Sequence, residues 1–121
     1  MKILDAINEQ ANFELESAYV YLTMSSYMAD QDMAGMKHFM DQQAKEEIEH
    51  AEKMIGFLQE VGYAVKYRPL DPGDGKFDSL LDVFKKALAH EKQVTENIYK
   101  LVDLARKEDY KPAESMLQWY V

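Results

Sequence analysis

The sequence has 121 residues, the size of a single domain that buries most of its apolar surface without added cross-links. It contains no cysteine, which excludes disulfides, thiolate metal sites and redox-active thiols, and its net charge of −8 argues against nucleic acid as a partner. The first ten residues lack the basic start and apolar run of a signal peptide, and no stretch has membrane-spanning length. We therefore expect a cytoplasmic protein with no membrane partner.

Good helix formers dominate the chain outside one proline- and glycine-rich segment, RPLDPGDGKFD at 68–78. We predict helices at about 2–29, 35–61 and 80–107, and the start of a fourth at about 112–121. The whole chain, 1–121, is expected to form one domain.

Three local signals support these boundaries. Gly62 is expected to end the second helix, because glycine tolerates the left-handed backbone that closes many helices. Ser79 and Asp82 form a capping-box-like pair at the start of the third helix. Pro112 suits the first turn of the fourth helix.

The connection lengths predict the topology. A turn of a few residues makes the first two helices an antiparallel hairpin. The second helix is roughly 40 Å long, at 1.5 Å per residue. The sixteen residues of the segment 63–78 span roughly 50 Å when extended, enough to return along the whole bundle. The prediction is an all-α four-helix bundle with one long crossover, in which the fourth helix is incomplete.

One inward stripe is expected on each of the first three helices, from residues at three- and four-residue spacing. Each stripe is largely apolar and carries a glutamate near its middle. The stripes are Leu4, Ile7, Ala11, Glu14, Ala18, Tyr21, Ser25 and Met28; Met33, Met36, Met40, Gln43, Glu47, His50, Met54, Phe57 and Val61; and Phe84, Ala87, Leu88, Glu91, Val94, Ile98, Leu101 and Ala105. His38 and His90 are expected to face outward.

The three central glutamates are predicted to lie at one level. Glu14 lies 17 residues before the turn near position 31 and Glu47 lies 16 after it, so an antiparallel hairpin sets them side by side. Glu91 lies at nearly the same distance from the start of its helix as Glu47 does in the parallel helix, a difference of about one or two ångströms of rise. His50 follows Glu47 by one turn on the same face.

A divalent metal explains this convergence. Burying several carboxylates together costs several kcal/mol per ion without a cation, and no lysine or arginine falls in the stripes. Oxygen ligands plus one imidazole suit iron, manganese or zinc, and the sequence does not choose among them. Glu47 reaches two ions at once, with Glu14 and His50 on one and Glu91 on the other.

Each of these residues also has a simpler interpretation when taken alone. A single Glu-x-x-His pair occurs by chance, and a lone glutamate could extend to solvent or pair with Gln43. Three glutamates at one level favour the metal. Tyr21 is expected either to hydrogen-bond a metal-binding carboxylate or to be an ordinary core tyrosine. Glu46 flanks the stripe, where a solvated position is the default.

The chain resembles the bacterial non-haem ferritins from end to end. The matching stretches are INEQANFELESAYVYLTMSSYM, AKEEIEHAEKM, AHEKQVTENI and LQWYV. The resemblance implies a ferritin-like bundle and a homo-oligomeric shell of 24 subunits, if the fourth helix is complete. Such a shell takes in ferrous iron, oxidises it with dioxygen or hydrogen peroxide at a di-iron ferroxidase centre, and stores ferric mineral.

The resemblance also implies roles for individual residues. The first iron site falls on Glu14, Glu47 and His50, and the second on Glu47 and Glu91. The tyrosine beside the centre matches Tyr21.

Two further points follow from the same likeness. Glu46 matches a ligand of the additional iron position of bacterial members. The haem-containing bacterioferritins and the rubrerythrins usually carry a second histidine where this chain has Val94, so the pattern resembles the non-haem ferritins and no haem is expected.

The sequence ends about ten residues into the predicted fourth helix. We expect it to be part of a longer chain, whose continuation completes that helix and supplies the remaining ligands of the second iron site near positions 124–128. The alternative is a truncated bundle with an incomplete site, which binds metal or serves as a structural element without catalysis.

Overall fold

The computed structural model describes all residues, 1–121, and contains helices and no strands. The elements are α1 (Lys2–Asp30), α2 (Ala34–Glu60), α3 (Leu80–Lys107), α4 (Lys111–Leu117) and the single 3-10 turn η1 (Gln118–Tyr120). The all-α class and the four-helix order predicted from the sequence are confirmed. None of the helices combines the length and the apolar composition that crossing a membrane requires.

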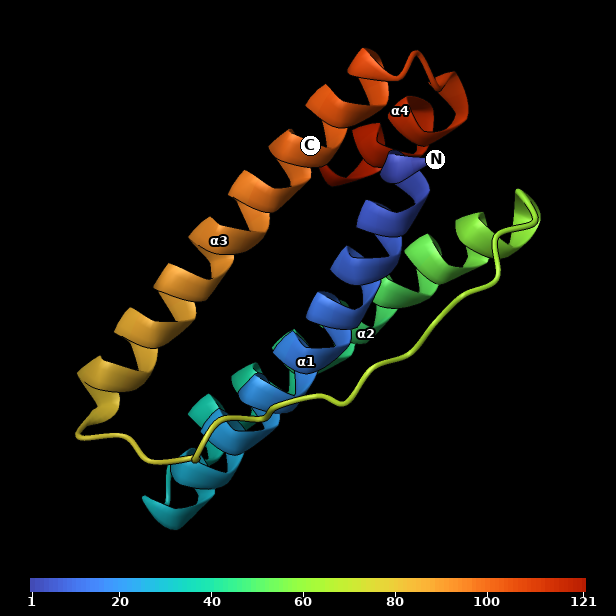
Figure 1. Ribbon diagram of the computed structural model, residues 1–121. Coiled ribbons are helices and arrows are strands. Elements are labelled where there is room, and N and C mark those ends of the chain that lie inside the picture. Colours follow the sequence, from blue (N-terminus) through green and yellow to red (C-terminus); the bar gives the residue numbers. More distant parts are fainter.

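Figure 1 shows the predicted topology. α1 and α2 form an antiparallel hairpin, and the crossover after α2 returns beside α1 to the far end of the bundle. α3 then runs parallel to α2, and α4 turns back at the end that holds the N-terminus. The α-helical part of the fourth helix ends at Leu117 rather than continuing to 121, and one 3-10 turn follows it.

The three long helices end in the same hydrogen-bonded motif. At the end of α2, Gly62 has a positive φ of 81°, and the N–H of Tyr63 donates to the carbonyl of Leu58. This is the Schellman arrangement, which satisfies carbonyls left free by the last helical turn. Asp32 and Asp109 adopt the same left-handed conformation after α1 and α3, where the sequence offered no glycine as a signal.

The crossover is attached to α1 by two buried asparagines. Asn8 pairs with both backbone groups of Lys66, since its amide donates to the carbonyl at 3.0 Å and its carbonyl accepts from the N–H at 2.9 Å. Asn12 donates to the carbonyl of Lys66 at 2.9 Å and accepts from the N–H of Arg68 at 3.1 Å. The asparagine side chains thus provide hydrogen-bond partners for the backbone of the extended crossover, which belongs to no sheet.

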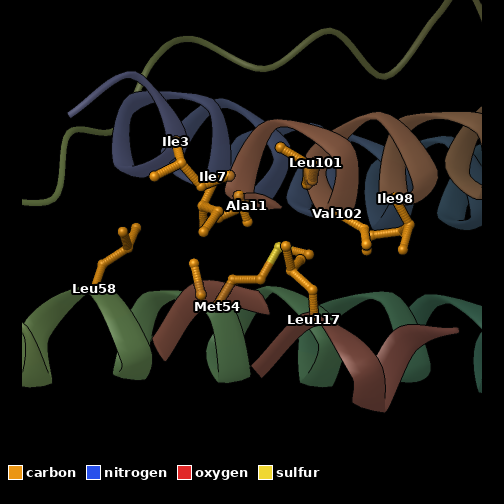
Figure 2. Packing of buried hydrophobic residues seen from close by; sticks show 11 residues of the cluster. Ile3, Ile7, Ala11, Met54, Leu58, Ile98, Leu101, Val102 and Leu117 are labelled. Carbon is orange, nitrogen blue, oxygen red and sulfur yellow. The ribbon is translucent and has the colours of Figure 1, made fainter. Parts of the chain in front are cut away.

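Two apolar clusters fill the bundle, one toward each end. The α4-end cluster joins all four helices, as Figure 2 shows. It consists of Ile3, Ile7, Ala11, Met54, Leu58, Ile98, Leu101, Val102, Ala105, Ala113 and Leu117. The turn-end cluster lies toward the α1–α2 turn and consists of Ala18, Tyr21, Met24, Met28, Met40, Ala44 and Val83. The candidate ligands on α1 and α2 lie between them in the chain.

Two of the expected inward positions are wrong. Met36 is 41% exposed and Leu88 is 57% exposed. α3 packs mainly against α1 and α4, so its side facing α2 is less covered than the stripe predicts. Leu88 there lines a surface cavity of about 220 Å³, together with Phe39 and Phe84.

Candidate metal centre

Two glutamates and a histidine from neighbouring helices meet midway along the α1–α2 hairpin. Glu14 comes from α1, and Glu47 and His50 come from one face of α2, three residues apart. One potential ligand atom from each residue lies within 4.8 Å of the others. The Nδ1 atom of His50 is 4.0 Å from Oε2 of Glu14 and 3.8 Å from Oε2 of Glu47. These spacings leave room for one ion between the three atoms.

The same three atoms are buried without a hydrogen-bond partner. Glu14 is 0% exposed and Glu47 is 2% exposed, so bulk solvent does not reach their free oxygens. Buried polar atoms are nearly always paired, and those that are not call for an explanation such as a bound ion. Two carboxylate oxygens and one imidazole nitrogen fit iron, manganese or zinc. The donor set and its missing partners therefore both fit a divalent cation.

The electrostatics of the centre point the same way. Burial raises the pKa of Glu14 above its ordinary value, and the neighbouring carboxylate of Glu47 raises it further. Burial also raises the pKa of Glu47, and the negative charge of Glu91 adds to that effect. Both glutamates are thus held in an environment that disfavours their ionised form. A divalent cation at this position would reverse the balance, since it favours the carboxylate.

Tyr21 and Glu91 form a second polar contact near Glu47. The Oη atom of Tyr21 donates to Oε1 of Glu91 at 2.5 Å. Burial and the adjacent carboxylate raise the pKa of Tyr21, which keeps the phenol protonated as a donor. Tyr21 thus hydrogen-bonds Glu91, whose role as a metal ligand stays a prediction. Glu91 is not one of the three residues whose ligand atoms converge.

The remaining predicted residues differ in their positions. Glu46 is exposed on α2 and lies outside the three-residue group, so a metal role for it stays a prediction. His38 is exposed, as expected. The outward prediction for His90 is wrong, because His90 is partly buried, hydrogen-bonds Ser17 and stacks on Phe13 at 5.1 Å between ring centroids. A pair of neighbours on α1 therefore draws this imidazole inward.

Sequence reasoning missed an aromatic contact from the end of the chain. The Oη atom of Tyr120 donates to the backbone carbonyl of His50 at 2.6 Å. The rings of Trp119 and Tyr120 both meet the His50 imidazole edge-on, with centroids 5.7 Å away. No local pattern could reveal this, because the contact joins residues 70 positions apart.

Sequence reasoning also missed the amide beside Glu14. Gln10 is 5% exposed, and its Nε2 donates to Oε1 of Glu14 at 3.2 Å. The four-residue spacing on one helix was the available signal. Asn97 of α3 donates in turn to Oε1 of Gln10 at 3.1 Å.

Comparison with known proteins agrees with this fold. Residues 4–121 match the family model described as a ferritin-like domain. The chain is 34% identical over 120 residues to a bacterial non-haem ferritin of Staphylococcus saprophyticus, covering 99% of this chain and 72% of that protein. It is 32% identical over 119 residues to the bacterial non-haem ferritin of Staphylococcus aureus, with coverage of 98% and 72%.

Two solved structures resemble the fold closely. The open-pore ferritin from the hyperthermophilic archaeon Archaeoglobus fulgidus superposes with a TM-score of 0.97 at 38% identity, covering 100% of this chain and 75% of that one. The ferritin of Chlorobium tepidum gives a TM-score of 0.97 at 32% identity, with coverage of 100% and 74%. The likeness thus extends over the whole of this chain and about three quarters of each relative.

Proposed function

Because the chain belongs to the ferritin family, we propose that it oxidises ferrous iron at the Glu14–Glu47–His50 centre and delivers the ferric product for storage. The observation that carries this proposal is the convergence of three buried, unpaired ligand atoms. Glu14 and His50 would hold one ferrous ion, Glu47 would bridge, and Glu91 would contribute to a second. Iron is here the substrate, because the oxidised ion leaves the centre.

The electron balance explains why two ions are needed together. Each ferrous ion releases one electron, and two electrons with two protons reduce dioxygen to hydrogen peroxide. When hydrogen peroxide is the oxidant instead, the two electrons of a ferrous pair and two protons reduce it to two molecules of water. The protein's residues fix the positions of both ions and shield them from solvent, which favours the paired transfer. Tyr21 would orient Glu91 through its hydrogen bond.

Storage requires an enclosed space, so we extend the proposal to a homo-oligomeric shell of 24 subunits. The support is family membership and the resemblance to the Archaeoglobus fulgidus protein, which is described as an open-pore ferritin. The cytoplasmic location stays a prediction.

A non-catalytic metal-binding bundle is the second candidate. It is favoured by the position of Glu91 outside the group of converging ligand atoms. In that case the centre would hold one ion without fast oxidation.

Ferrous oxidation kinetics distinguish the two candidates. The comparison is between the unmodified protein, Glu47→Ala and the control Glu49→Ala, which removes an exposed glutamate from the same helix. We expect Glu47→Ala to slow initial ferric formation by at least about 100-fold, since even outer partners of metal ligands typically contribute 10- to 100-fold. Glu49→Ala should match the unmodified protein. Equal rates in all three would overturn the ferroxidase proposal.

A further inference from the structure

A row of amides connects the surface of α3 to the metal centre. Gln93 donates from Nε2 to Oδ1 of Asn97 at 2.8 Å, and Asn97 donates from Nδ2 to Oε1 of Gln10 at 3.1 Å. Gln10 then donates from Nε2 to Oε1 of Glu14 at 3.2 Å. Gln10 is buried between the helices, whereas Gln93 is exposed. The row therefore fixes a buried amide on one side of Glu14.

The chemistry of the groups sets the direction of the row. A bound divalent ion favours the ionised form of Glu14, and an ionised carboxylate only accepts hydrogen bonds, so Gln10 must turn its NH₂ group toward Glu14 in the metal-bound protein. Its carbonyl then faces Asn97, which must present its own NH₂ group. Each amide has one orientation that satisfies both neighbours, and the partly buried Asn97 holds Gln10 in that orientation.

The row makes the two oxygens of Glu14 unequal. Oε1 accepts the hydrogen bond from Gln10, whereas Oε2 has no partner and lies 4.0 Å from Nδ1 of His50. If Glu14 rotated to offer both oxygens to one ion, Oε1 would leave the buried amide of Gln10 unpaired. Leaving a buried donor unsatisfied is unfavourable, so the rotation is opposed.

We propose that Gln10, held by Asn97, is a positioning residue that restricts Glu14 to binding metal through Oε2 alone. This inference rests on the proposed function, because it requires a divalent ion at the Glu14–Glu47–His50 centre. Gln10 itself contacts the carboxylate and not the ion. We expect Gln10 to contribute to metal affinity, because loss of a hydrogen-bond partner of a metal-binding carboxylate typically changes that affinity by 10- to 100-fold.

The test uses Co²⁺ as the probe and measures binding rather than turnover. Gln10→Met keeps the length of the side chain and removes both hydrogen-bonding atoms. We expect it to weaken Co²⁺ binding by about 10- to 100-fold. The matched control is Gln42→Met on the exposed face of α2, which should bind as the unmodified protein does.

Infrared spectra provide a second measurement. The carboxylate bands would not change if Gln10 only stabilised the fold. The separation between the two carboxylate stretching bands is wide for one-oxygen binding and narrow for two-oxygen binding. The metal-dependent carboxylate bands are obtained by subtracting the spectrum of the metal-free protein, and a change caused by Gln10→Met is assigned to Glu14, the carboxylate that Gln10 contacts. We expect wide separation in the unmodified, Co²⁺-loaded protein and narrower separation in Gln10→Met.

Asn97→Ala keeps the test informative if Gln10→Met fails to fold, because it leaves Gln10 in place and only frees its orientation. We expect a smaller loss of affinity in the same direction, with the fold checked by circular dichroism. Unchanged affinity and band separation in the folded variants would overturn the role of Gln10. Two-oxygen binding by Glu14 in the unmodified protein would also overturn it.

The Glu47→Ala variant separates this failure from failure of the centre itself. If the unmodified protein binds Co²⁺ no more tightly than Glu47→Ala, the metal centre is wrong, and the inference fails with it. If the unmodified protein binds more tightly than Glu47→Ala but no differently from Gln10→Met, only the inference about Gln10 is wrong.

Discussion

Helix α1 buries polar side chains against two neighbours, and their hydrogen bonding differs. Toward the crossover, Asn8 and Asn12 have partners for both their donors and their acceptors. Toward α2, Glu14 keeps one oxygen that nothing in the chain pairs. Both groups are buried, so burial alone does not distinguish them. Buried polar side chains whose donors and acceptors all have partners indicate a structural contact. Several buried polar atoms that converge without hydrogen-bond partners indicate a site for a ligand.

Removing the asparagine contacts should have the largest effect on stability. Asn8→Ala together with Asn12→Ala removes four hydrogen bonds to the crossover and leaves backbone groups of Lys66 and Arg68 without protein partners. At about 1 kcal/mol per bond, the free energy of unfolding should fall by about 3–4 kcal/mol. Chemical denaturation measures this change, with Gln59→Ala as the exposed control. A loss as small as that of the control would contradict the structural role of the crossover contacts.

Neutralising Glu14 should raise the stability of the metal-free protein, whereas removing the asparagine contacts lowers it. Burial raises the pKa of this carboxyl, so ionising it costs free energy in the folded state. Glu14→Gln removes that cost and should raise the free energy of unfolding by about 1–3 kcal/mol at pH 7. Divalent metal should stabilise the unmodified protein against heat and leave Glu14→Gln unchanged.

The sign of the pH dependence follows from the same raised pKa. The unfolded chain loses the proton of Glu14 near the ordinary value of 4.5, whereas the folded protein retains it to higher pH. Stability of the metal-free protein therefore falls as pH rises above 4.5, and the advantage of Glu14→Gln grows over the same range. Thermal melts at pH 4 and pH 7 check this. If Glu14→Gln stabilised the protein more at pH 4 than at pH 7, the stabilisation could not come from removing the cost of ionising Glu14.

Tyr21→Phe should produce a smaller loss. Removing the hydroxyl leaves Oε1 of Glu91 without its donor, which should lower the free energy of unfolding by about 1 kcal/mol. In calorimetric titration with Zn²⁺, the first ion should bind at the Glu14–Glu47–His50 centre with unchanged affinity. Tyr21 makes no hydrogen bond to any of these three residues. Loss of this binding would mean that Tyr21 supports the whole centre rather than Glu91.

Glu46→Gln should have the smallest effect. Its exposed side chain lies outside the converging group, so affinity for the first ion should change by less than about twofold, as expected for exposed charges. Glu49→Gln, which changes another exposed glutamate of α2, is the control. A clear difference between the two would give Glu46 a part in metal binding that its position on α2 does not explain.

The architecture could be predicted because it depends on connection lengths and helical periodicity. The long segment before α3 implied a crossover, and the common level of Glu14 and Glu47 followed from counting residues from the turn. Met36 and Leu88 were misplaced because periodicity identifies an apolar face without showing whether a neighbouring helix covers it. The positions after α1 and α3 also escaped prediction, because aspartate rather than glycine adopts the left-handed conformation there.

The converging residues of the candidate centre were easier to predict than the groups around them. Glu14, Glu47 and His50 share a period and a level, which sequence alone reveals. Asn97 and Tyr120 reach the centre through contacts between residues far apart in the chain, and those contacts depend on how α3 and α4 pack. His90 was placed outward for the same reason, because its partners Ser17 and Phe13 lie on a different helix.

Anomalous diffraction from crystals loaded with Zn²⁺ tests the central claim most directly. We predict one strong peak between Oε2 of Glu14, a carboxylate oxygen of Glu47 and Nδ1 of His50, at about 2.0–2.2 Å from each ligand atom. The peak should vanish in Glu47→Ala. Zinc bound only by exposed carboxylates, with the three buried ligand atoms still unpaired, would contradict the assignment of this cluster as the metal centre.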